Sequence, residues 1–185
     1  MPLQFYQKKL EGDFWGLTNP VIMNKEMMYL YGSEGLQLDG HSRGGMTIGN
    51  AMKSMLNDPY AEGAMGGLSV NFFGAAFNVY TGDDLLAQLQ NRSFYPEEDH
   101  SGMSLHYQNH RYDPVGRLPF VGNNPSSGGE MPGFLLPNLL KETGRALLGL
   151  EGTTHNCYGK ASGFGCGGFW ENDVPKLIPV TMGSH

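Results

Sequence analysis

The sequence is poor in cysteine, in long apolar runs and in basic residues. Its two cysteines, Cys157 and Cys166, have no spacing typical of a zinc ligand set, and the sequence leaves open whether they pair. No apolar run approaches the roughly 20 residues needed to cross a bilayer, and no signal peptide opens the chain. Twelve Lys and Arg residues against 18 Asp and Glu give a formal net charge of -6, which argues against nucleic acid as a partner.

The remaining composition is that of a globular protein. A chain of 185 residues with 39% hydrophobic residues can bury one good core, so we expect a single domain over residues 1–185. Glycine is abundant, with 28 residues against 11 prolines, which suits a fold with many tight turns between strands and helices. No pattern in the sequence indicates a cofactor or a metal.

Apolar periodicity predicts strands that alternate with helices. We expect strands at 36–39, 68–74 and 103–107, and helices at 18–32, 46–56, 83–89 and 134–150. Asp83 and Asp84 would lie in the first turn of their helix. This order predicts an α/β fold with a mainly parallel sheet and flanking helices, in which active groups lie at the carboxyl ends of the strands.

The segment Gly40-His41-Ser42-Arg43-Gly44 has the Gly-x-Ser-x-Gly pattern of a nucleophile elbow. Small neighbours let a strand and a helix pass closely on either side of a serine in a cramped turn. The turn would expose the Ser42 hydroxyl and direct the backbone N–H of Arg43 toward a developing oxyanion. The alternative is a glycine-rich turn in which the serine has no chemical role.

A serine nucleophile needs an acid that orients its base, and Asp113 is the best candidate for that acid. It follows a predicted strand, and Pro114 fixes the turn after it. The alternative for Asp113 is a side chain that stabilises the turn. The other candidate aspartates after the serine are Asp58, Asp83, Asp84 and Asp99.

His155 is the best candidate for the general base. In α/β-hydrolases the chain order is serine, acid, histidine, and His155 is the one histidine after Asp113 apart from the terminal His185. His106 and His110 precede the acid and would be the next candidates. His41, beside the serine, is expected to shape the elbow.

Three segments together resemble the class 3 (fungal-type) lipases: 40–45, which is similar to their GHSLGG elbow, 72–78, and 113–119 around the acid. The resemblance is good over about residues 36 to 120. It implies an α/β-hydrolase fold and a serine esterase or lipase that hydrolyses acyl esters without a cofactor. Carried over residue by residue, it implies Ser42 as nucleophile, Asp113 as orienting acid and His155 as base, with the Arg43 N–H in the oxyanion hole.

A second resemblance links segments 14–19, 41–44 and 155–159 to C-terminal modules of filamentous-haemagglutinin and contact-dependent growth inhibition proteins. It implies a secreted interbacterial toxin that is delivered into a target cell as part of a larger protein. A phospholipid substrate, transient contact with a membrane surface and a bound immunity protein would follow. The alternative function is a non-catalytic, hydrolase-like interaction module of such a toxin.

Few residues precede Ser42, whereas a complete α/β-hydrolase places several strands before its nucleophile. We therefore expect a fold truncated on its N-terminal side, as the C-terminal portion of a longer parent, with the source of the first oxyanion donor left open. The apolar edge of strand 36–39 would be covered by residues 3–10, by an upstream segment or by a bound protein.

Overall fold

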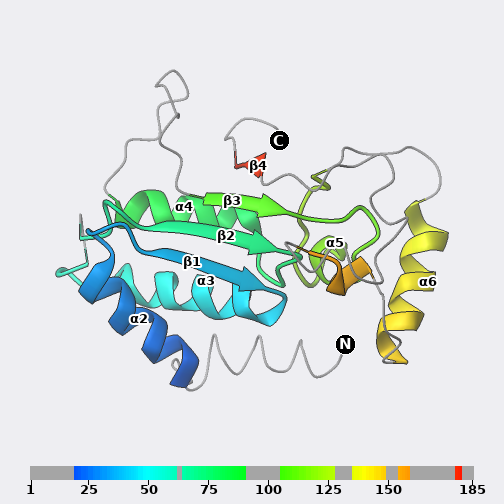
Figure 1. Ribbon diagram of the computed structural model, residues 1–185, viewed down its shortest axis with the longest axis horizontal. Coiled ribbons are helices and arrows are strands. Elements are labelled where there is room, and N and C mark those ends of the chain that lie inside the picture. The colour runs from blue at the N-terminus through cyan, green and yellow to red at the C-terminus, as the bar shows by residue number, and fades with distance from the viewer. Residues whose placement is uncertain are drawn as a thin grey trace.

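A computed structural model describes residues 19–61, 64–90, 105–127, 135–148, 154–158 and 178–180 (Figure 1). The elements up to the second strand are α2 (Asn19–Tyr31), β1 (Gln37–His41), α3 (Arg43–Met55) and β2 (Ser69–Phe73). The later elements are α4 (Val79–Leu89), β3 (Leu105–Gln108), α5 (Pro114–Arg117), α6 (Leu135–Leu147), the 3-10 turn η2 (Thr154–Asn156) and β4 (Ile178–Pro179).

The strands form one sheet in the order β1-β2-β3-β4. β1 pairs in parallel with β2, and β2 in parallel with β3, whereas β4 joins β3 antiparallel. The α/β class and the mainly parallel sheet with flanking helices are thus confirmed. Since β1, β2 and β3 run the same way, their carboxyl ends lie along one edge of the sheet (Figure 1).

The two faces of the sheet differ in character. Helices α3 and α4 pack against each other and against β1 and β3 respectively, and α2 packs on α3 (Figure 1). Leu38 of β1 and Phe72 of β2 are among the buried side chains of this layer, together with methionines of α3 such as Met52. The opposite face carries polar side chains, where Asn71 donates a hydrogen bond of 2.7 Å to Asp39.

The predicted start of the third helix was wrong. Helix α4 begins at Val79, and the side chain of Asn78 caps it by accepting from the Thr81 amide at 3.0 Å. Asp83 consequently lies in the second turn and is buried. Asparagine is a favoured capping residue, so Asn78 marked the helix start better than the two aspartates did.

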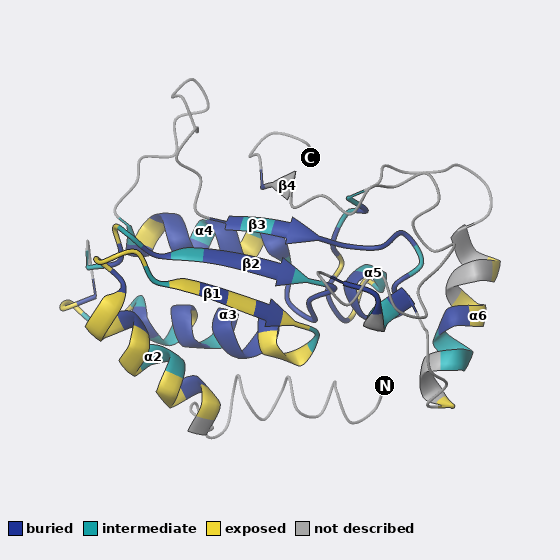
Figure 2. Ribbon diagram, in the orientation of Figure 1, coloured by how far each residue is buried: buried dark blue, intermediate teal, exposed yellow. Residues whose placement is uncertain are grey.

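Strand β1 lies at one end of the strand order, so within the described residues it has a strand partner on one side alone. Its exposed and buried positions alternate, and β1 is visibly the most exposed of the three parallel strands (Figure 2). The residues 3–10 that the sequence offered as a cover lie outside the described part of the chain. None of the described helices is long and apolar enough to cross a membrane.

Candidate active site

Ser42 lies in the turn that joins β1 to α3, in a conformation that non-glycine residues rarely adopt. Its φ is 54° and its ψ is −120°. Two glycines make room for this turn, because a Cβ on Gly40 would lie 2.8 Å from the Gly45 Cα, and a Cβ on Gly45 would lie 2.5 Å from the Ala75 Cβ. The hydroxyl of Ser42 makes no capping bond to helix α3. Strained backbone of this kind occurs at functional sites and at nucleophile elbows.

The structure brings Ser42, His155 and Asp113 together in one chain of hydrogen bonds. His155 Nδ1 lies 2.9 Å from Asp113 Oδ1 and 3.0 Å from Oδ2. Because an ionised carboxylate can only accept, Nδ1 carries the proton of the imidazole. Nε2 is then an acceptor, and it lies 2.8 Å from the Ser42 hydroxyl oxygen, which donates to it. The adjacency that the sequence predicted for these three side chains is therefore present.

Asp113 is fully buried just beyond β3, where it also begins α5. Its Oδ1 accepts hydrogen bonds from the amides of Val115 at 2.8 Å and Gly116 at 3.3 Å. Pro114, at the first helical position, has no amide to satisfy. The turn-stabilising role that the sequence left open and the contact with His155 thus belong to the same carboxylate.

Tyr158 is a site residue that the sequence analysis missed. Its hydroxyl donates to Asp113 Oδ2 at 2.5 Å and accepts from the His110 amide at 3.0 Å. No local pattern in the sequence marks it, because its contact with Asp113 joins residues that are 45 positions apart in the chain. Gly74, with a φ of 50°, lets these side chains close up, because a Cβ there would meet both Asp113 Oδ2 and the Tyr158 ring.

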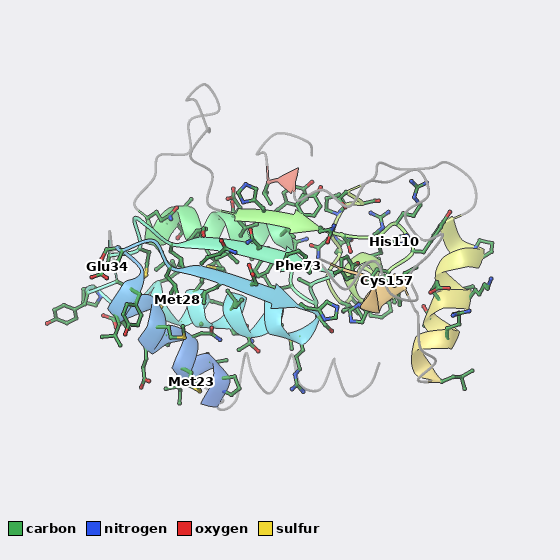
Figure 3. The ribbon with its side chains drawn as sticks, viewed as in Figure 1. Met23, Met28, Glu34, Phe73, His110 and Cys157 are labelled. Atoms are coloured by element: carbon green, nitrogen blue, oxygen red, sulfur yellow. The ribbon has the colours of Figure 1, made fainter. Side chains whose placement is uncertain are left out.

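Hydrogen bonds from Thr154 and a disulfide at Cys157 hold the turn η2, which carries His155, in place. The buried Thr154 donates its amide to Glu142 Oε2 of α6 at 3.1 Å and its hydroxyl to the Tyr112 carbonyl at 3.2 Å. Cys157 is buried and disulfide-bonded, and the other cysteine of the sequence, Cys166, lies outside the described residues. Figure 3 shows Cys157 beside η2, beyond the carboxyl ends of the strands. These contacts fix a turn that has little regular structure of its own.

Electrostatics favour an ionised Asp113. Burial would raise its pKa, but the charge of a protonated His155 and the hydrogen bonds from His155, Tyr158 and Val115 hold the pKa of this carboxyl below its usual value. Burial and the neighbouring Asp113 raise the pKa of Tyr158 well above its ordinary value, so the phenol remains a donor. A buried carboxylate with satisfied hydrogen bonds can accept from Nδ1 and stabilise positive charge on the ring.

Arg43 is the first residue of α3, so its backbone amide lies at the N-terminus of that helix, directly after the serine. The amides of a first helical turn point toward the helix start, where the helix dipole favours negative charge. An oxyanion formed on a substrate at Ser42 could be stabilised there.

The other candidates lie elsewhere or have other partners. His106 lies on β3, and the buried His110 accepts at Nδ1 from the Tyr112 amide at 3.1 Å, so neither replaces His155 in the contact with Ser42. Asp58 accepts a hydrogen bond from Tyr29. Asp99 lies outside the described part of the chain.

No cluster of three or more His, Cys, Asp or Glu side chains that could hold a metal ion occurs among the described residues. No family model, curated protein or solved structure was found to match the chain.

Proposed function

We propose that this chain is a serine hydrolase of the lipase type, with an α/β-hydrolase-like fold, that cleaves acyl esters. The observation that carries the proposal is the hydrogen-bond chain from the Ser42 hydroxyl through both ring nitrogens of His155 to the buried Asp113. A strained serine between a strand and a helix, a base in the correct tautomer and an orienting carboxylate are the three parts that covalent acyl transfer needs.

In the proposed reaction, Ser42 Oγ attacks the ester carbonyl carbon while His155 Nε2 takes the hydroxyl proton. Asp113 stabilises the imidazolium, and the Arg43 N–H stabilises the oxyanion. His155 then gives the proton to the leaving alcohol as the carbon–oxygen bond to it breaks, which leaves an acyl group on Ser42. Water, deprotonated by His155, attacks the acyl carbon and releases the carboxylic acid and free Ser42.

The substrate we propose is a lipid acyl ester, and the setting is that of an interbacterial toxin. Both rest on the resemblance of segments 40–45 and 113–119 to class 3 lipases and of segment 155–159 to toxin modules. A panel of soluble short-chain esters and phospholipid vesicles separates a lipase from a general esterase. A higher rate of hydrolysis for phospholipid in vesicles than for the soluble esters supports a lipid substrate.

The second candidate is a non-catalytic interaction module, which one observation favours. Within the described residues β1 has no strand on its outer side. A non-catalytic role does not explain why a histidine is held between a serine hydroxyl and a buried carboxylate. The two candidates differ in whether Ser42 turns over an ester.

Substitution of the serine tests the proposal. Ser42→Ala should lower kcat/KM for ester hydrolysis roughly 10⁴-fold, because only the oxyanion hole and binding effects remain. Ser54→Ala is the matched control: this serine lies on α3, where its hydroxyl bonds the Ala51 carbonyl at 2.7 Å, and its loss should leave the rate unchanged. Equal rates in the wild type and Ser42→Ala, with both proteins folded, would refute a catalytic Ser42.

A further inference from the structure

His41 is joined to the base as well as to the nucleophile. It precedes Ser42 in the chain, and its Nε2 lies 2.7 Å from the carbonyl oxygen of His155. The two imidazole rings stack with their centroids 4.8 Å apart and their planes at 29°. The ring of Tyr158 also packs against His41, with the centroids of the two rings 5.6 Å apart. One residue thus connects the elbow to the turn η2, from which the base projects.

The contact defines where the proton of His41 lies. A carbonyl oxygen can only accept, so Nε2 of His41 must carry a hydrogen. In the neutral ring, Nδ1 is then without a proton. The described titratable groups that face His41 are His155, Asp113 and Tyr158. Burial, set against the hydrogen bond to the His155 carbonyl, lowers the pKa of His41, which favours the neutral ring near pH 7.

We propose that His41 is a positioning residue for the reaction: as a neutral Nε2–H donor, it holds the backbone of His155 so that the base stays over Ser42. The proposal rests on the proposed function, since it concerns the geometry of the same base. In this role His41 acts through the backbone of His155.

The neutral state of His41 matters as much as its hydrogen bond. During acyl transfer His155 becomes an imidazolium, and a second positive charge in a ring stacked on it would destabilise that cation. A neutral donor fixes the turn without this repulsion. A lysine at position 41 could supply a donor but would add a permanent charge next to the base.

Four variants separate the hydrogen bond from ring stacking and from charge. His41→Gln can place an amide N–H near the position of Nε2, and we expect kcat within about threefold of the wild type. His41→Phe keeps the ring and loses the donor, and His41→Asn is too short to reach the carbonyl. Both should lose roughly 10- to 100-fold in kcat with little change in KM, because a misplaced base slows the chemical step. Thermal unfolding of each variant shows whether it is folded.

The charge is tested by His41→Lys and its pH profile. A fixed positive charge should lower the kinetic pKa of the base, which moves the acid limb of kcat/KM to lower pH, while the plateau rate falls. A purely structural role would leave this kinetic pKa where it is. An equal loss of kcat in His41→Gln and His41→Phe, with both proteins folded, would overturn the proposal, as would an unshifted acid limb in His41→Lys.

A measurement on the unmodified protein covers the case in which variants do not fold. Nitrogen-15 NMR of histidine-labelled protein at pH 7 should show His41 as a neutral ring protonated at Nε2, and a charged or Nδ1-protonated ring would overturn the proposal. This reading does not depend on activity. If the wild type hydrolyses no ester and its Ser42 reacts with no fluorophosphonate, the proposed function fails; a wrong His41 tautomer in an active enzyme overturns the positioning role alone.

Discussion

Asp113 depends on a hydroxyl that belongs to none of the three residues proposed for catalysis. Its Oδ2 accepts from Tyr158, and its Oδ1 accepts from the Val115 amide. A buried carboxylate that loses one donor is less well stabilised as an anion, and a hydrogen bond to a charged group contributes about 1.5 to 3 kcal/mol. The orientation of His155 therefore depends on Tyr158 through Asp113.

Tyr158→Phe should lower the free energy of unfolding by about 2 kcal/mol at pH 7 and kcat by roughly tenfold. The pKa of Asp113 is lower in the folded protein than its unfolded value of about 3.9, so its contribution is present above that pH and is lost as the pH falls through the folded value. Removing the Tyr158 hydroxyl raises the folded-state pKa. The difference in unfolding free energy between the two proteins should therefore be constant above about pH 5 and shrink in stronger acid.

Urea unfolding from pH 3 to 8 measures this difference. Tyr60→Phe is the matched control, because Tyr60 is 86% exposed and the substitution likewise removes one tyrosine hydroxyl. A pH-independent difference for Tyr158→Phe would show that its hydroxyl does not act through the ionisation of Asp113.

Two of the three proposed catalytic residues, Ser42 and Asp113, carry a local signature in the sequence, whereas His155 was predicted from its position after Asp113 in the chain. Gly40-x-Ser42-x-Gly44 predicts a nucleophile elbow, and Asp113 before Pro114 predicts a turn after a strand. Tyr158 and Gly74 have no such signature, since their contacts with Asp113 join segments about 40 residues apart in the chain. Only the folded sheet brings those segments together.

At the scale of elements, the turn η2 determines whether the base reaches the serine. It is three residues long and is held by Thr154, which bonds Glu142 of α6 and the carbonyl of Tyr112. So short a turn has few backbone hydrogen bonds of its own, and its position depends on its neighbours. Cys157, which follows it directly, is covalently tied.

Reduction of the disulfide should therefore lower activity as well as stability. We expect the free energy of unfolding to fall by about 2 to 4 kcal/mol, since a disulfide restricts the unfolded chain. Activity at a temperature well below unfolding should also fall, because Cys157 lies two residues from His155. Treatment with a phosphine reductant, ester hydrolysis and thermal unfolding measure both effects.

Cys157→Ser with Cys166→Ser is the control for incomplete reduction. Full activity of the reduced and folded protein would show that the other contacts of η2 are sufficient to place His155.

The observed bounds of the helices and strands show which of them could be located from apolar periodicity and turn residues. Helix α2 covers the predicted segment after Thr18, and β1 and β2 lie close to their predicted ranges. Helix α3 begins earlier than predicted, at Arg43, because the strained Ser42 turns the chain directly from strand into helix. Periodic apolar residues begin only at Met46, so periodicity alone could not locate that start.

At the scale of the whole molecule, the outer side of β1 is the feature most in need of a partner, because no strand of the described part of the chain pairs with it there. The Leu36 carbonyl accepts from the Ser69 amide, and the Ser42 amide donates to the Phe73 carbonyl. The backbone N–H and C=O groups of the even-numbered residues of this segment therefore point toward β2. In a parallel ladder the alternate residues, Gln37 and Asp39 among them, direct their amides to the other side. Strand edges of this kind are normally covered in native proteins.

We predict that the amides of residues 37, 39 and 41 are protected in the active protein. Residues 3–10, an upstream segment or a bound protein would supply the cover. Hydrogen exchange measured by NMR on the 185-residue chain, with light scattering to define its oligomeric state, tests this. Rapid exchange of these three amides in an active monomer would contradict the need for a cover.

The central claim is that Ser42 is a nucleophile activated by His155, and labelling with a fluorophosphonate tests it most directly. The reagent forms a stable adduct with an activated serine, which mass spectrometry of the digested protein locates. We predict one adduct, on the peptide that contains Ser42, absent from Ser42→Ala and strongly slowed in His155→Ala. A folded protein that remains unlabelled, or that is labelled at another serine, would contradict the account.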